Sequence, residues 1–122
     1  MALRKSPQAL VDAFDRSLPK DALVERRKMF GFPAVFVNGN LFCGLHQEDV
    51  IVRLSSDQRT LLERAGGVRW EPTAGRVMRE YMLLPRTAGA RVMKRWLARS
   101  FMFARSLPPK AVKGRRPNRS AR

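Results

Sequence analysis

The sequence predicts an α+β fold, a small two-layer domain in which helices pack on an antiparallel sheet of about five strands. Residues 10–18 and 87–103 place apolar side chains at the helical period of about 3.6 residues. Between them lie short strand-like apolar runs, two of which are separated by Asn-Gly, the strongest short-range hairpin signal. A chain of 122 residues with 44% hydrophobic content suffices for one domain with one core. The expected order of elements is roughly α-β-β-β-α-β-β-α.

The first helix is expected to begin at Ser6-Pro7. A serine hydroxyl at a helix start accepts hydrogen bonds from free N–H groups, and a proline there lacks only an N–H that has no partner within the helix. The apolar side chains that follow share one stripe, which must pack on the sheet: Leu10, Val11, Phe14 and Leu18.

Three strands are predicted next, over residues 24–30, 33–37 and 41–45. Asn38 and Gly39 tolerate the positive φ angles of a type I′ turn, which places Phe36 opposite Leu41. With regular alternation along each strand, one face of the sheet then holds Ala34, Phe36, Leu41, Cys43 and Leu45.

Residues 50–54 alternate as a fourth predicted strand, and the exact boundaries of the strands in this part of the chain are left open. Ser55 or Ser56 then caps a short helix, which Gly66-Gly67 ends because glycine adopts the left-handed geometry without a Cβ clash. Residues 68–76 are expected to form a loop or a weak strand. Residues 77–84 are expected to form the last strand.

The last predicted helix, residues 87–103, separates apolar from basic side chains. Its apolar arc holds Val92, Met93, Trp96, Leu97, Ser100, Phe103 and Ala104. Beyond it, prolines, small residues and positive charges leave too little apolar surface to offset the entropy of ordering. We therefore predict a folded domain over residues 1–104 and a disordered basic tail over residues 105–122.

Charge is the main indication of function. The chain has 25 Lys and Arg against 10 Asp and Glu, and no acidic residue follows Glu80. A block of one sign repels itself and favours an anionic partner. We predict weak, sequence-independent nucleic-acid binding by the last helix and the tail, through Arg91, Lys94, Arg95, Arg99, Arg105, Lys110, Lys113, Arg115, Arg116, Arg119 and Arg122. A purely solubilising tail and an acidic protein or membrane surface are the other interpretations of this charge.

The alternative function is a protein-interaction or small-ligand module on the sheet surface, with the tail only solubilising. Exposed aromatic and Met side chains favour recognition, and the surface predicted on this basis consists of Met29, Phe32, Trp70 and Tyr81.

Met29-Phe30-Gly31 also has a structural interpretation, which we favour at this point. In it, Met29 or Phe30 fills the core, and Gly31 permits a bend or bulge between two strands.

No pattern indicates catalysis or metal binding. Cys43 and His46 are the only soft-ligand pair, and strand alternation places them on opposite faces. The acidic residues have no recognisable catalytic spacing, and no glycine-rich phosphate-binding motif occurs. We expect no enzyme activity, no cofactor and no metal site.

Three segments resemble the N-terminal domain of TfoX/Sxy-like proteins: Arg-Lys-Met-Phe-Gly at 27–31, Asn-Gly-Asn-Leu-Phe at 38–42 and Gly-Arg-Val-Met-Arg-Glu-Tyr-Met-Leu-Leu-Pro at 75–85. The resemblance implies a small domain with an antiparallel sheet backed by helices over about residues 7–104. The family is known for the regulation of natural competence genes, so the resemblance also implies a regulatory role.

Location and partners follow from general features. The sequence contains no secretory signal and no apolar run of the ~20 residues that span a bilayer. The single Cys43 agrees with a reducing compartment. We therefore expect a cytoplasmic protein that does not enter membranes. Its expected partners are nucleic acid, another protein or a second copy of the chain, since a short sheet leaves edges that symmetric pairing can cover.

Overall fold

The computed structural model describes residues 5–110. The elements are α1 (Gln8–Ser17), β1 (Val24–Met29), β2 (Phe32–Val37), β3 (Asn40–His46), β4 (Asp49–Arg53), α2 (Ser56–Arg64), β5 (Val68–Arg69), β6 (Tyr81–Leu83) and α3 (Ala90–Arg105). Six strands form one antiparallel sheet in the order β1-β2-β3-β4-β6-β5. The predicted α+β fold is confirmed, and the fourth strand predicted at residues 50–54 is present as β4.

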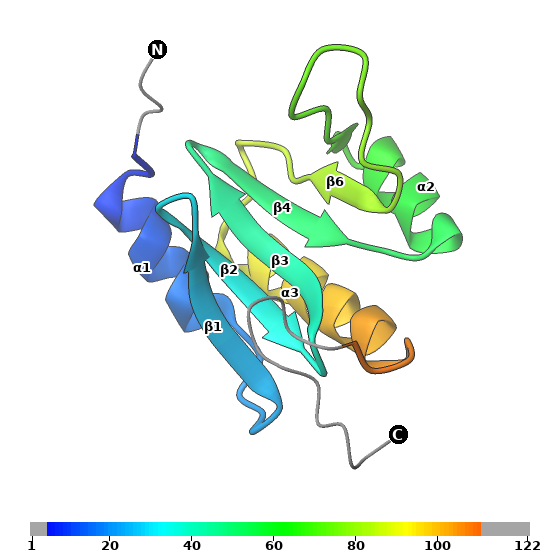
Figure 1. The fold of residues 1–122 in the computed structure, drawn as a ribbon. Helices are drawn as coiled ribbons and strands as arrows, with labels where there is room; N and C mark the ends of the chain where they lie inside the picture. The colour runs from blue at the N-terminus through cyan, green and yellow to red at the C-terminus, as the bar shows by residue number, and fades with distance from the viewer. Residues whose placement is uncertain (1–4, 111–122) are drawn as a thin grey trace.

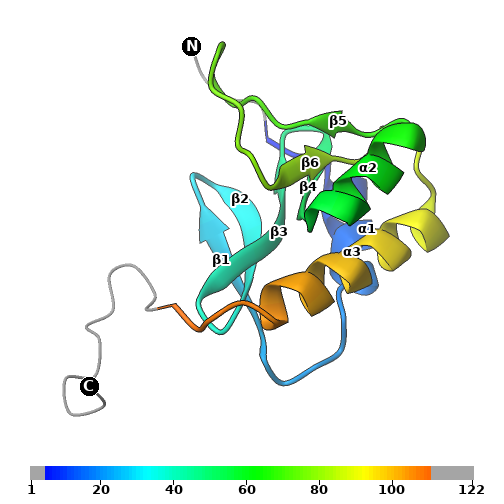
Figure 2. The same cartoon turned by 90° about the vertical axis from the view of Figure 1, so that its right-hand side faces the viewer.

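Helices α1 and α3 cover one face of the sheet, and α2 lies beside β5 and β6 (Figure 1). The core lies between the sheet and these helices, and its fully buried side chains include Phe14 of α1, Phe42 of β3 and Leu97 of α3. The turned view shows α1 and α3 on one side of the strands, while the loop between β5 and β6, residues 70–80, stands on the other side (Figure 2). We call this second side the open face.

Two-residue turns join the first four strands into a meander. Asn38 and Gly39 have φ angles of 51° and 81°, as the predicted turn requires, and Phe36 lies opposite Leu41. Phe30 and Gly31 repeat this geometry at 55° and 84°, so the first strand ends one residue earlier than predicted. Gly31 therefore forms the expected bend. Neither Met29 nor Phe30 fills the core, because 41% and 88% of their respective surfaces are exposed.

A register shift in the β2–β3 pair corrects the predicted sheet face. Phe36 pairs with Leu41, but Val35 pairs with Cys43, so Phe42 is an extra residue in β3. Such a bulge breaks the alternation of side chains. Cys43 consequently packs in the helix-side core together with Val35. The set Ala34, Phe36, Leu41, Cys43 and Leu45 is thus divided between both faces, with Cys43 and Leu45 on the helix side.

The helix starts differ in how well local sequence predicts them. In α1 the predicted Ser6 cap is wrong: Pro7 is the N-cap residue, and its carbonyl accepts hydrogen bonds from the N–H groups of Leu10 and Val11, both at 3.0 Å. The Ser6 hydroxyl has no hydrogen-bond partner in the part of the chain described. In α2 the Ser55 hydroxyl accepts from the N–H of Gln58 at 3.4 Å, as predicted.

Helix α3 buries Met93, Trp96, Leu97, Ser100, Phe101 and Ala104. Phe101 was expected outside the apolar arc, and Phe103 inside it. At 100° per residue, Phe103 lies near one edge of the apolar arc, and Phe101 lies about 40° beyond the other edge, next to Leu97. The bulged Phe42 decides between them, because its ring packs edge-on against Phe101 with the centroids 5.5 Å apart.

The predicted strand over residues 77–84 is shorter than expected. Only Tyr81–Leu83 pair as β6, and Val77 is 45% exposed in the loop that precedes them. Thr73 and Arg76 form an isolated bridge within this loop. Residues 70–80 thus extend away from the sheet plane and form a wall beside the open face (Figure 2).

Candidate functional site

The basic side chains of α3 lie on the side of the helix that faces away from the sheet. Arg91, Lys94, Arg95 and Arg105 are exposed, and Arg99 is half-buried. We call these five residues the basic face of α3. Over the described residues, no ion pair is formed by any of the five. Their positive charges are therefore available to an anionic partner.

Two members of the basic face also have structural contacts. The Arg99 guanidinium lies over the Trp96 ring, 4.8 Å from its centroid, and donates a hydrogen bond to Gln58 at 3.4 Å. The Arg105 guanidinium lies 5.9 Å from the Phe101 ring centroid. Cation–π contacts of this kind restrain the side chain without neutralising it.

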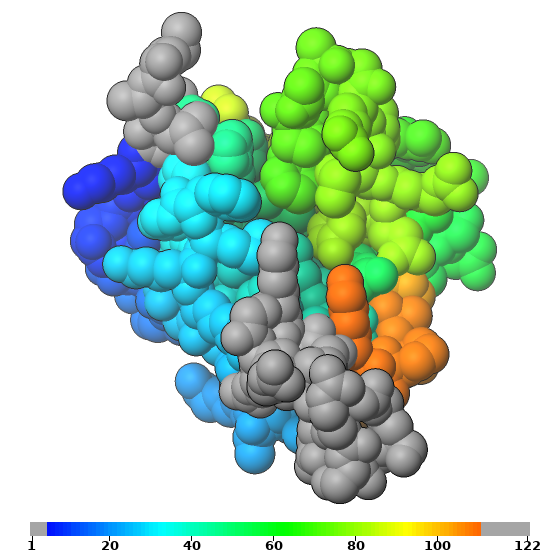
Figure 3. Space-filling model, viewed as in Figure 1, coloured from blue at the N-terminus to red at the C-terminus, as the bar shows by residue number. Residues whose placement is uncertain are grey.

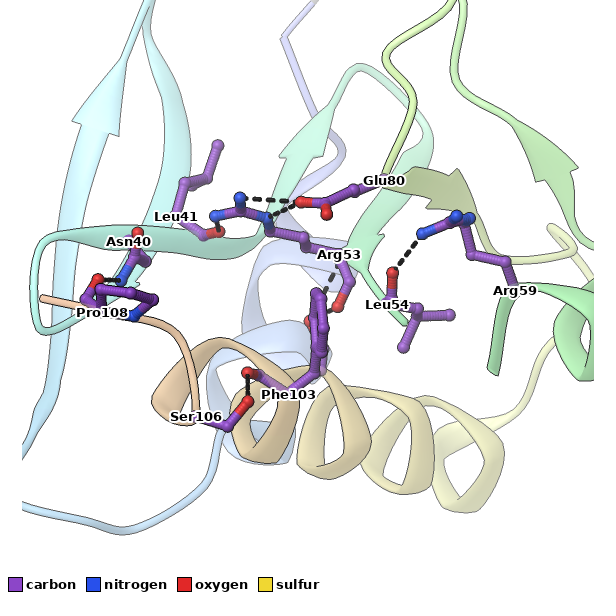
Figure 4. A network of polar contacts seen from close by, with 10 residues as sticks. Asn40, Leu41, Arg53, Leu54, Arg59, Glu80, Phe103, Ser106 and Pro108 are labelled. Carbon is purple, nitrogen blue, oxygen red and sulfur yellow. Dashed lines mark hydrogen bonds and ion pairs between the residues drawn. The ribbon is translucent and has the colours of Figure 1, made fainter. Parts of the chain in front are cut away.

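The chain after α3 returns to the β2–β3 hairpin. Asn40 donates a side-chain hydrogen bond to the carbonyl of Pro108 at 3.0 Å (Figure 4). The N–H of Lys110 donates to the carbonyl of Asn38 at 2.8 Å. Lys110 thereby lies beside the open face and not beside the basic face of α3. Other residues predicted to bind nucleic acid lie outside the described residues: Lys113, Arg115, Arg116, Arg119 and Arg122.

The open face carries a concave apolar site of about 380 Å³, which we call the apolar hollow. The β1–β2 hairpin borders one side and the β5–β6 loop borders the other (Figure 3). Its floor consists of Phe32, Ala34 and Ile51, which are 6%, 3% and 6% exposed although they do not face the helices. Apart from His46 and Cys43, its lining side chains are hydrocarbon, aromatic or thioether groups.

A row of rings crosses the open face. The ring centroids of Phe32 and His46 are 5.2 Å apart, those of His46 and Trp70 6.4 Å, and those of Trp70 and Tyr81 6.0 Å. The Arg53 guanidinium lies 5.5 Å from the Tyr81 ring. The four residues predicted as a partner or ligand surface are thus gathered on one face, where Met29, Phe32 and Trp70 line the apolar hollow.

A second concavity of about 470 Å³ adjoins the first, and Met29 and Leu41 line both. We call it the basic hollow because its lining includes Arg27, Lys28, Arg53 and Lys110, together with Tyr81.

Acidic partners neutralise two of the basic groups in this hollow. Arg53 pairs with Glu80 at 2.8 Å and donates to the Leu41 carbonyl at 3.5 Å (Figure 4). Arg27 pairs with Glu25. Within residues 5–110, Lys28 and Lys110 form no ion pair.

The environment of Tyr81 changes its acidity. Burial raises the pKa of Tyr81 above its ordinary value of 10.0, the positive charge of Arg53 lowers it, and Glu80 raises it. The raised pKa extends to higher pH the range in which the phenol is neutral and able to donate a hydrogen bond.

Cys43 and His46 lie on opposite faces, as predicted. Cys43 belongs to the helix-side core, and complete burial raises the pKa of its thiol. His46 contacts Phe32 and Trp70 on the open face. Across the described part of the chain, no group of three or more His, Cys, Asp or Glu residues is placed to hold a metal ion.

Sequence reasoning missed the charged half of the open face and the turn residue Phe30. Arg53 interrupts an apolar strand and Arg27 and Lys28 precede a hairpin, but only the successive pairing of β1, β2, β3 and β4 in one sheet brings them together. Gly31 was the one local signal for the turn, because glycine readily adopts a positive φ angle, whereas Phe30 does not.

Comparison with known proteins identifies the family to which this α+β domain belongs. A family model described as the TfoX N-terminal domain matches residues 17–104, which span α1's last residue to the last turn of α3. No curated protein and no solved structure matches the chain. Among residues 5–110, no helix is long and apolar enough to cross a membrane. The match covers most of the chain, including every strand of the sheet, and the protein therefore belongs to the TfoX N-terminal domain family.

Proposed function

We propose that the protein is a non-enzymatic, cytoplasmic regulatory domain that binds nucleic acid weakly and without sequence preference. The supporting observation is the basic face of α3, where five cations lie on one 16-residue helix that contains no acidic residue. Membership of the TfoX N-terminal domain family supports the regulatory part of the proposal. We further propose that the regulation is related to competence and that gene selectivity is supplied by a partner.

The spacing of the basic face suits a phosphate backbone. Arg91 and Arg105 lie ~20 Å apart along a helix that rises 1.5 Å per residue. Lys94, Arg95 and Arg99 fill the interval, so several phosphates can be contacted together. Side chains at the centre of this face, Ala98 and Met102, offer no aromatic surface for stacking on bases. Phosphate contacts give affinity but carry no sequence information.

Titration of the full chain against duplex DNA at several salt concentrations tests the proposal. Each neutralised phosphate releases condensed cations, so about 5 contacts give a slope near −4 to −5 for log affinity against log salt. Scrambled and promoter duplexes should give the same slope. If residues 111–122 also contact phosphates, a chain that ends at Lys110 should give a flatter slope than the full chain. This variant keeps the hydrogen bonds of Pro108 and Lys110.

A matched pair of variants locates the contacts. Replacing Arg91, Lys94 and Arg95 with Gln should reduce the slope by about 0.9 per lost contact. A control with the same change in net charge replaces the exposed Lys20, Arg76 and Arg79 with Gln, and its slope should stay near that of the parent. Equal effects of the two triple variants, or no binding at low salt, would refute a specific role for α3.

The expected homodimer stays a prediction. Strand β1 is an edge strand of six residues, so its outer hydrogen-bonding groups are available for pairing. Charged side chains on β1, including Arg26 and Lys28, oppose close approach of a second copy. Sedimentation at low and high salt decides between these effects, because salt weakens the repulsion.

A further inference from the structure

We propose that the open face binds a small amphipathic carboxylate, with its hydrocarbon part in the apolar hollow and its acid group at the basic hollow. This site lies on the face of the sheet opposite α3, so it is independent of nucleic-acid binding by that helix. Two structural observations carry the inference: an apolar concavity that adjoins a basic one, and an exposed aromatic side chain held in an unfavourable backbone conformation.

The apolar hollow has the size and chemistry of a small-molecule site. Its volume of about 380 Å³ lies within the usual range for ligand pockets, about 300–1,000 Å³. Such pockets combine an apolar lining with a few polar groups that orient the ligand. Here the floor is apolar, His46 and the buried Cys43 are the titratable side chains of the lining, and the Trp70 ring lies 6.4 Å from the His46 ring.

Phe30 provides the second observation. The two hairpin turns have nearly the same backbone, with φ angles of 55° and 84° at Phe30-Gly31 and 51° and 81° at Asn38-Gly39. Asn is suited to the first position of such a turn, whereas a bulky aromatic residue is rare at positive φ. Phe30 lines the apolar hollow while 88% of its surface remains exposed. Folding does not need this ring, so its position at the rim points to a binding role.

Charge selects the class of ligand. The two hollows share Met29 and Leu41, so an apolar group in one places its head group near the other. Lys28 and Lys110 line the basic hollow and form no ion pair with any described residue, while Arg27 and Arg53 have acidic partners. The lining of the basic hollow includes four basic residues and no acidic one, which favours an anion over an alcohol or an amine of the same chain length.

Titration of the full chain with octanoate, 1-octanol and octylammonium tests this inference. We expect saturable binding of octanoate, weaker binding of octanol by about fivefold, and no measurable binding of octylammonium. The two Trp indole N–H signals in a ¹H–¹⁵N spectrum report the position. The signal of Trp70 should move with octanoate, and that of Trp96, on the helix side of the sheet, should not.

Phe30→Asn separates binding from folding. Because Asn suits the turn, this variant should unfold at a higher temperature than the parent and bind octanoate about tenfold more weakly, since an aromatic wall is lost. The control Asn38→Phe makes the reverse change in the other turn. It should unfold at a lower temperature and retain affinity for octanoate.

The charge contribution has its own pair of variants. Lys28→Gln combined with Lys110→Gln should weaken octanoate binding and leave octanol binding unchanged. The control combines Lys94→Gln with Arg95→Gln, which removes the same amount of positive charge from α3. It should leave the affinity for octanoate and for octanol unchanged.

Several outcomes would overturn the proposal. The first is equal affinity for the three ligands. The second is movement of the Trp96 indole N–H signal instead of the Trp70 signal. The third is octanoate binding by Phe30→Asn that is as tight as that of the parent. Sedimentation with vesicles of phosphatidylglycerol provides the last arm. Binding to vesicles without binding to free octanoate would identify the open face as a membrane contact and would refute a site for a free carboxylate.

Discussion

The hydroxyl of Ser100 on α3 accepts a hydrogen bond from the backbone N–H of Arg53 at 3.1 Å. The same oxygen lies 2.9 Å from the Arg53 carbonyl and also contacts the carbonyl of Phe42, and one of these acceptors takes its single proton. Ser100 is fully buried. This one side chain therefore joins α3 to β3 and β4, at the end of β4 where the Arg53 side chain turns to the open face.

Ser100→Ala should destabilise the domain by about 1–3 kcal/mol, because it leaves the Arg53 N–H without its hydrogen-bond acceptor in the protein interior. Urea denaturation measures the change. The control Ser106→Ala removes an exposed hydroxyl whose one hydrogen bond within residues 5–110 is to the Phe103 carbonyl at 2.6 Å. This variant should stay within about 0.5 kcal/mol of the parent. An equally small effect of both substitutions would contradict the role given to Ser100.

Gly39→Ala should cost more than Gly31→Ala, although both glycines have a φ angle near 80°. Either alanine meets the left-handed penalty of about 1–2 kcal/mol. A Cβ on Gly39 would also lie 1.6 Å from the carbonyl oxygen of Lys110, whereas a Cβ on Gly31 has no atom within 4 Å. The segment over residues 106–110 must therefore move in the first variant only.

A chain that ends at Arg105 provides the control for this comparison. Without the segment, the two substitutions should cost the same free energy of unfolding. A larger cost for Gly39→Ala that persists in the shortened chain would show that contact with Lys110 is not its cause.

Trp96→Ala should lower the free energy of unfolding by about 3–5 kcal/mol, a large part of the stability of a small domain. Trp96 was predicted to be buried on helical phase, and its 5% exposure confirms this. Iodide quenching of fluorescence in a Trp70→Phe background checks the position without destabilising the core. Strong quenching of the remaining tryptophan would place it in solvent and contradict the structure.

The domain should lose stability as the pH rises above 9.0, the ordinary pKa of a cysteine thiol. Burial raises the pKa of Cys43 in the folded state, so the folded protein retains a proton that the unfolded chain releases. The resulting stabilisation is fully present below the unfolded pKa and is lost as the pH rises toward and through the folded pKa.

Thermal unfolding between pH 7 and pH 11 measures this loss, and Cys43→Ala should reduce it. The part that remains in the variant includes Tyr81, whose pKa is also raised above its ordinary value of 10.0. An unchanged pH dependence in Cys43→Ala would exclude the thiol as a source. In the native protein at pH 8, thiol reagents should label Cys43 only as fast as the domain opens.

Local signals determined those parts of the structure that need only a few neighbouring residues. Asn38-Gly39 specifies its own turn, Ser55 caps α2 through the nearby Gln58, and Gly66 ends that helix with a φ angle of 103°. The apolar arc of α3 and its basic face follow from spacing along one helix. The sequence by itself therefore determined the class of the fold, most elements and the charge of the outer helix.

Tertiary packing decided which side chains enter the core where the spacing of residues along the chain could not. The bulge at Phe42 moves Cys43 to the helix side and selects Phe101 over Phe103, because only a folded sheet brings that ring against α3. Tertiary structure also decided the two hollows, whose linings combine residues from the β1–β2 hairpin, β3, β4, the β5–β6 loop and the segment after α3. No short sequence pattern encodes such a site, since its walls meet only when strands distant in the chain pair in one sheet.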